Sequence, residues 1–176
     1  MSTRPDPLAV GLTVEMVPVP LWGSNLRTLA PEAWRIVRAR ARAEAESCAY
    51  CGEAPEHCHE VWEYAEHDGD EGTARLVHVA MICEHCHDVV HLGRTGKVHG
   101  VAGIDQAKAH LGAVNGWSDE QVEAHVAQAQ ATWERRSAMR WGLDFGPVVH
   151  EYGLSADDLR GIPVAMSATV REEVAG

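Results

Sequence analysis

The residues best suited to chemistry lie between positions 48 and 91, where four of the chain's five cysteines form two C-x-x-C pairs. The pairs are Cys48 with Cys51 in "CAYC" and Cys83 with Cys86 in "CEHC". Four thiolates satisfy the tetrahedral geometry of a structural zinc ion, and in a cytosolic protein this spacing favours metal over disulfide bonds. We therefore predict one structural Zn²⁺ at these cysteines. The alternative is that they are reduced and buried without metal.

Histidines surround the second pair in the run "CEHCHDVVHLG". His87 and His91 are four residues apart, so they share one face of a helix that begins near Cys83. We expect His87 to lie beside the zinc in a positioning role, and His91 to face the preceding strands. Further donors fall on those strands: Cys58, His59, Glu60 and His78. They predict a second metal site, against the alternative that each histidine is ordinary polar surface.

These donors need two strands and a helix to bring them together. Residues 57–64, "HCHEVWEY", alternate as a strand does, "DGDEG" is typical of a turn, and residues 74–83, "ARLVHVAMIC", are rich in β-formers. "EHCHDVVHLG" then predicts a short helix that stops at Gly93. The order is strand, strand, helix, with one cysteine pair before the first strand and the other at the start of the helix.

The flanks predict further helices. Pro31 suits the first turn of the helix "PEAWRIVRARARAEA". A second helix ends at Asn115-Gly116, and a third, "WSDEQVEAHVAQAQATWERRSAMRW", begins with a capping box of Ser118 and Gln121. Ser155 is a cap for a helical turn in "LSADDLRGI", and the last dozen residues are expected to be loose. The predicted organisation is an extended arm (1–30), an Arg-rich helix (31–47), a zinc-knuckle core (48–95), a helical extension (96–146) and a partly ordered tail (147–176).

Composition limits the partners. The 176 residues are 45% hydrophobic, and no apolar run approaches the ~18 residues of a membrane span. The N-terminal residues lack the pattern of a signal peptide, so we expect a soluble cytoplasmic protein with no membrane partner. The net charge of −11 disfavours a strong general affinity for DNA.

The distribution of charge leaves two interpretations open. Arg35, Arg38 and Arg42 lie along the first helix, with Arg40 beside them, either as a solvated face or as contacts to a nucleic-acid backbone. Residues 53–71 carry eight acids and no Lys or Arg, a segment that repels a polyanion unless metal ions or histidinium offset it. The acids are Glu53, Glu56, Glu60, Glu63, Glu66, Asp68, Asp70 and Glu71.

The motifs "CAYC", "CHE" and "LVHVAMICEHCHDVVH" resemble the HNH family, the ββα-metal nucleases with a zinc knuckle. The flanking stretches "LWGSNLR", "HLGRTGK", "HLGAVNGW" and "WERRSAMRWGLDFG" are similar to a bacterial and phage subgroup of it. The resemblance covers roughly residues 19–146. It implies an α+β fold: a ββα-metal HNH-like core with a four-cysteine zinc knuckle, flanked by additional α-helices.

In that family the first strand supplies a metal ligand followed by a general-base histidine, and a helix histidine, matching His91, also binds the ion. An asparagine five residues before the third cysteine orients the base; here that position is His78. The first strand allows two registers. Either Cys58 binds metal and His59 activates water, or His59 binds metal and Glu60 is the base. The histidine-rich set suits Mn, Ni, Zn, Fe or Cu better than the Mg²⁺ that the family also uses.

Three functions follow. The first is a metal-dependent phosphodiester hydrolase of the DNA endonuclease class, with His59 activating water, His91 holding a divalent ion, and Arg35, Arg38 and Arg42 contacting DNA. The second is a metalloenzyme on the same scaffold that acts on a small molecule through His59, His78 and His91. The third is a non-catalytic zinc module. A homodimer fits an enzyme that cuts both strands, but no segment of the sequence specifies an interface.

Overall fold

The computed structural model describes residue 8, residues 11–160 and residue 162, and it combines helices with a three-stranded sheet. The predicted combination of helices and sheet is therefore confirmed. The chain divides into two compact units, which are described separately: unit 1 is 1–18, 45–59 and 81–136, and unit 2 is 19–44, 60–80 and 137–176. The elements are η1 (Val19–Leu21), α1 (Leu26–Leu29), α2 (Pro31–Glu44), β1 (His57–His67), β2 (Glu71–Ile82), α3 (Glu84–Val90), α4 (Leu92–Asn115), α5 (Asp119–Ser137), β3 (Arg140–Asp144) and α6 (Gly146–Tyr152).

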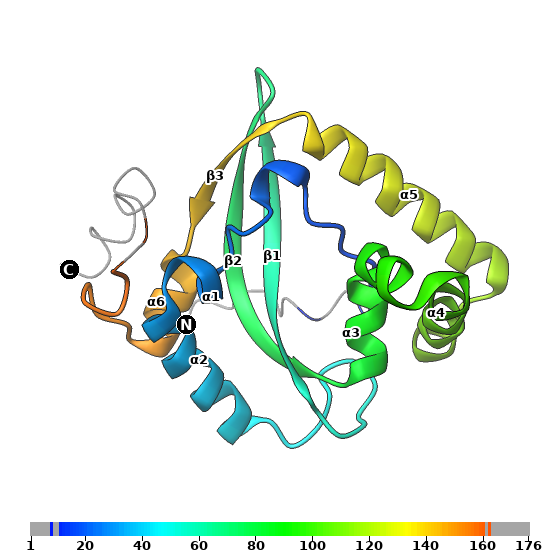
Figure 1. Cartoon of the computed structure of the whole chain (residues 1–176), viewed down its shortest axis with the longest axis horizontal. Helices are drawn as coiled ribbons and strands as arrows, with labels where there is room; N and C mark the ends of the chain where they lie inside the picture. The colour runs from blue at the N-terminus through cyan, green and yellow to red at the C-terminus, as the bar shows by residue number, and fades with distance from the viewer. Residues whose placement is uncertain (1–7, 9–10, 161, 163–176) are drawn as a thin grey trace, which may run out of the picture. The chain divides into compact units, whose positions relative to one another are not determined.

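The sheet has the order β1-β2-β3 (Figure 1). The predicted turn joins β1 to β2 as a hairpin, with Gly69 and Asp70 at φ of 78° and 59°. So short a connection makes the two strands antiparallel. β3 pairs with β2 in parallel, Glu71 opposite Arg140 through Arg75 opposite Asp144. Both hairpin strands contribute residues to each unit.

Unit 1 contains α3, α4, α5 and the arm before η1 (Figure 1). The capping box is confirmed: Ser118 N–H donates to Gln121 Oε1 at 2.9 Å, and Gln121 N–H to Ser118 Oγ at 3.3 Å. The predicted stop at Gly93 is wrong, because α3 ends at Val90 with His91 as its C-cap. Gly93 instead lies in the first turn of α4. The Thr95 hydroxyl donates to Asp88 O at 2.8 Å, and this bond satisfies a carbonyl at the end of α3.

Unit 2 holds α1, α2, β3 and α6. The helix predicted from Pro31 is confirmed, and it buries Ala33, Val37 and Ala41. The third predicted helix ends earlier than expected, at Ser137, because the chain then turns to form β3. Gly72 accommodates this strand, since a Cβ there would collide with the ring of Trp141. Sequence periodicity gave no sign of this non-local pairing.

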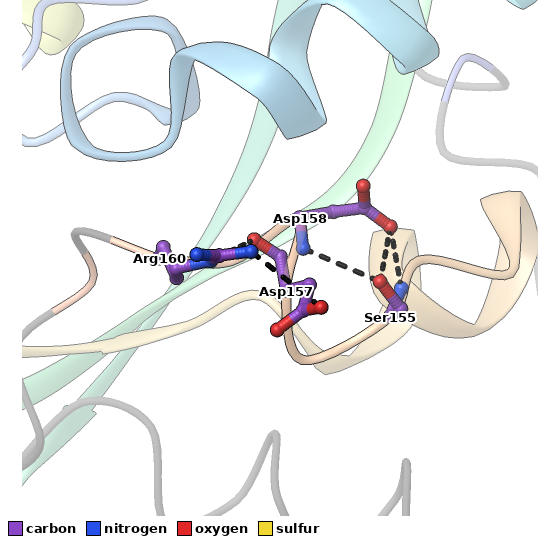
Figure 2. Close-up of polar contacts among 4 residues, drawn as sticks. All are labelled: Ser155, Asp157, Asp158 and Arg160. Carbon is purple, nitrogen blue, oxygen red and sulfur yellow. Dashed lines mark hydrogen bonds and ion pairs between the residues drawn. The ribbon is translucent and has the colours of Figure 1, made fainter.

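The segment after α6 forms a turn rather than a helix (Figure 2). Ser155 caps it as predicted: its N–H and Oγ both donate to Asp158 Oδ2, at 2.8 and 2.6 Å, and Asp158 N–H donates back to Ser155 Oγ at 3.3 Å. These bonds lower the pKa of Asp158. The looseness expected of the last dozen residues falls outside the described part, as do most of the first ten. In the part of the chain that is described, no helix has the length and apolar character needed to cross a membrane.

Candidate metal centres

The first centre is formed by Cys48, Cys51, Cys83 and Cys86, whose sulfurs all lie within 4.8 Å of one another. Cys51 Sγ and Cys83 Sγ are 3.5 Å apart. Sulfurs that share one tetrahedral zinc are about 3.8 Å apart, because each Zn–S bond is about 2.3 Å long. Three of the four cysteines are buried. The four predicted ligands therefore converge, and they are positioned to bind a metal ion such as zinc.

Local backbone geometry brings the two pairs together. The first pair is tied to the end of β2, since Ala49 N–H donates to Met81 O at 3.0 Å and Glu56 N–H to Ile82 O at 2.9 Å. The second pair begins α3, with Cys83 as N-cap accepting a hydrogen bond from Cys86 N–H at 3.4 Å. A helix N-terminus favours negative charge, so this placement stabilises a thiolate.

The electrostatics of the sulfurs also favour a cation. Burial raises the pKa of Cys48, but backbone N–H donors from Cys83, Tyr50 and Cys51 outweigh it and bring the pKa to about 7. Burial raises the pKa of Cys51 to about 11, and burial together with the charge of Cys48 raises that of Cys86 further. Of these three thiols, Cys48 is the one whose ionisation the protein favours without a cation. A divalent metal ion at the centre stabilises the thiolate form of its ligands.

A histidine from α4 contacts this centre. His110 Nε2 lies 3.2 Å from Cys86 Sγ, and the ring of His85 lies 5.5 Å from that of His110. When Cys86 is a metal-bound thiolate, it can only accept, so Nε2–H of His110 is the donor. No local sequence pattern points to His110, because only the packing of α4 brings its ring to the sulfur of Cys86.

The second group of donors is a set of histidines on β1 and α3. Alternation along β1 puts His57 and His59 on one face, and both reach the histidines of α3. The rings of His59 and His91 are 5.2 Å apart and edge-on, those of His57 and His87 are stacked at 4.3 Å, and those of His87 and His91 are 4.7 Å apart. The structure thus brings together His59 and His91, as the sequence predicted, and adds His57.

His59 is 4% exposed, and its Nε2 atom is buried with no hydrogen-bond partner. The nearest acid is Glu15, whose Oε2 is 3.4 Å from that nitrogen. A buried polar atom without a partner is costly, by about 1–3 kcal/mol, and calls for an explanation such as an ion or a water molecule. Glu15 comes from the arm, far from His59 in sequence, and no local pattern pointed to it.

His87 on α3 and His91 at its C-cap are both held neutral. Burial, with the nearby charges of His59, His87 and Arg94, lowers the pKa of His91 to about 3. Burial, with His57 and His59, lowers the pKa of His87 to about 4. A neutral imidazole is the form that binds metal, so neither ring must lose a proton for an ion to bind at neutral pH.

The other predicted donors lie elsewhere. Cys58 and Glu60 alternate to the opposite face of β1 from His59. The Glu60 carboxylate accepts from Leu26 N–H at 2.9 Å and from Trp62 Nε1–H at 3.1 Å. His78 is in unit 2, where its Nδ1 is 3.2 Å from Glu151 Oε1. The contacts described for His59 and His91 involve His57, His87 and Glu15, and not Cys58, Glu60 or His78. The predicted roles of these three residues stay predictions.

The arginines of α2 lie on the exposed side of that helix. Arg35, Arg38 and Arg42 are exposed, and their spacing places them along one stripe. The Nε of Arg35 is 3.1 Å from Glu32. Arg40 instead donates to Tyr152 O at 2.6 Å, so it has a structural contact within unit 2.

Comparisons with known proteins add no assignment. No protein-family model matches the chain, and no curated protein or solved structure is similar to it at a significant level.

Proposed function

We propose that the chain is an HNH-like metal-dependent phosphodiester hydrolase of the DNA endonuclease class. Its catalytic ion would be held by His59 and His91, next to a structural zinc at the four cysteines. The observation that carries the proposal is the buried, unpartnered Nε2 of His59 beside the ring of His91. The order of β1, β2 and α3, with a cysteine pair on either side of the hairpin, supports the proposed ββα-metal core.

The ring separation supports one shared ion. Two imidazoles bound to the same tetrahedral metal have centroids about 5 Å apart, because each nitrogen is about 2 Å from the ion. The observed 5.2 Å fits this value. Both predicted registers of β1 included His59, and its buried nitrogen favours a role as metal ligand over a role as the base.

In this proposal His59 and His91 would hold a divalent ion, which would lower the pKa of bound water and offset the charge on a phosphodiester. The stacked rings of His57 and His87 lie next to this pair. Exposed Arg38 and Arg42 are proposed as contacts to the phosphate backbone, which offset part of the net charge of −11.

The test is plasmid nicking by the zinc-loaded protein with Mg²⁺, Mn²⁺ or Ni²⁺. Cleavage is expected with at least one ion, and His91→Ala should reduce it about 100-fold or more while the zinc content stays at one per chain. His99→Ala, at an exposed position on α4, is the matched control and should cleave normally. Absence of cleavage with every ion would refute the endonuclease proposal.

The acidic tip of the hairpin favours a second candidate, a metalloenzyme of the same scaffold with a small-molecule substrate. Glu63, Glu66, Asp68, Asp70 and Glu71 are all exposed there. Such a surface repels DNA but not a small neutral or cationic substrate. Binding of a second metal without any nicking would favour this candidate, and zinc alone at one equivalent would favour the non-catalytic zinc module.

A further inference from the structure

The arm before η1 carries an acid to the His59–His91 pair. Glu15 is about three-quarters buried, its side chain being 26% exposed, and its Oε2 lies 3.4 Å from Nε2 of His59. Both residues belong to unit 1, as does His91. An acid from outside the strand–strand–helix segment thus faces the one buried ring nitrogen among the described residues that has no hydrogen-bond partner.

The separation of Glu15 and His59 fits two ligands of one ion better than a direct bond. A charge-assisted N–H···O bond is about 2.7–2.9 Å long, and the observed contact does not qualify as a hydrogen bond. A nitrogen and an oxygen that bind the same tetrahedral ion, each at about 2.1 Å, are about 3.4 Å apart. The measured 3.4 Å matches this edge, just as the 5.2 Å between the rings of His59 and His91 matches a shared ion.

The backbone around Glu15 is held from several sides. Glu15 N–H donates to Val90 O, next to His91, at 2.9 Å. Val14 N–H donates to His125 Nε2 at 3.0 Å, and Asn115 makes bonds to both the N–H and the O of Leu12, at 3.3 and 2.7 Å. The carboxylate is therefore presented by a fixed backbone, as a metal ligand requires.

We propose that Glu15 is the third protein ligand of the second metal ion, together with His59 and His91. This inference rests on the proposed second metal site. Two imidazoles and one carboxylate leave coordination positions open for water and substrate, and they suit Mn²⁺, Fe²⁺, Ni²⁺ or Zn²⁺ better than Mg²⁺. The carboxylate also offsets one of the two positive charges of the ion.

The site differs from the cysteine centre in how far its donors have converged. In the described ranges 11–160, with residues 8 and 162, the four cysteines are the only group of three or more donors within 4.8 Å of one another. The three proposed ligands must therefore close by side-chain rotation when the ion binds. The Glu15–His59 contact and the His59–His91 ring spacing each fit a shared ion, so the pair that still has to approach is Glu15 and His91, the latter at the break between α3 and α4.

The test measures Mn²⁺ binding to the zinc-loaded full chain by electron paramagnetic resonance. The wild type should bind one Mn²⁺, His91→Ala should bind none, and Glu15→Gln should bind it about tenfold or more weakly with unchanged zinc content. Glu120→Gln, at an exposed acid of α5, removes the same charge and should leave the affinity unchanged.

The outcomes separate the two proposals. If the wild type binds no Mn²⁺, the second site itself is refuted. If the wild type binds Mn²⁺ and His91→Ala does not, but Glu15→Gln binds it normally, the assignment of Glu15 is refuted while the site stands. If Glu15→Gln fails to fold, Glu15→Asp replaces it: the shorter carboxylate should weaken Mn²⁺ binding at least threefold, and an unchanged affinity would refute the assignment.

Discussion

The cysteine centre and the proposed His59–His91 site, both in unit 1, differ in how their donors are gathered. The four cysteines come from one tight turn and one helix start, they are mostly buried, and their sulfurs lie within 4.8 Å of one another. The second group draws His59 from a strand, His91 from a helix break and Glu15 from the arm, and it has not closed to the same degree. A structural zinc site is closed by four protein ligands, whereas a catalytic site keeps a position open.

Because of this difference, we expect the cysteine centre to determine the stability of unit 1 and the histidine group to determine its reactivity. Removing a cysteine should leave thiolates without their cation inside a buried cluster, whereas removing a histidine should leave the backbone intact. The cysteine centre also ties the start of β1 and the end of β2 to the start of α3, so metal bound there contributes to folding. The histidine group lies on elements that are already held by other contacts.

The largest expected effect comes from Cys86→Ser. Cys86 is fully buried, and a structural zinc contributes on the order of 10 kcal/mol of apparent binding free energy, so unit 1 should lose its folded structure. Far-UV circular dichroism and zinc content measure the outcome. His59→Ala is the contrasting variant and should keep both. A folded, zinc-loaded Cys86→Ser protein, or an unfolded His59→Ala protein, would reverse the proposed roles of the two centres.

A smaller effect is expected at His110, which contacts the cysteine centre from α4. Its Nε2–H to Cys86 Sγ bond stabilises the thiolate, so His110→Ala should weaken zinc affinity about 10-fold to 100-fold without unfolding the chain. Competition with a chromogenic chelator measures it. His85→Ala, at the exposed histidine beside it, is the control. Equal zinc affinity in His110→Ala and the wild type would show that the contact adds nothing.

The sequence predicted the cysteine centre because spacing alone determines it. A hairpin brings its two ends together, so two C-x-x-C pairs on either side of it lie close in space. The patterns that predict the strands, the turn and the helix are all local in sequence. The pair His59 and His91 was expected because His59 lies on the first strand and His91, four residues after His87, faces the strands from the helix. Strand alternation also puts His57 on the face of His59, but His57 was not among the predicted donors.

What the sequence did not reveal depends on contacts between distant segments. Glu15 and His110 reach their centres only through tertiary packing, and β3 exists because it pairs with β2. The helical pattern of the sequence continues past Ser137, and it predicts a helix there. Pairing with the edge of β2 makes this segment a strand instead. Strand alternation already places Cys58 and Glu60 on the face of β1 opposite His59, and the contact of His78 with Glu151 is again one between distant segments.

The smallest expected effect concerns the hydrogen bond that holds the arm to α5, and it appears as a change in how stability depends on pH. Burial lowers the pKa of His125, whose Nε2 accepts the N–H of Val14, and protonation would remove this acceptor. A histidine with a lowered folded pKa contributes stability above its unfolded pKa of about 6.5 and loses it as the pH falls.

Urea unfolding should therefore show stability falling from pH 7.5 to pH 5, as also expected from the other buried histidines. His125→Gln keeps an acceptor but cannot titrate, so its stability should fall less steeply than that of the wild type over this range. Identical slopes for the two proteins would show that the bond between His125 and the arm does not contribute to this pH dependence.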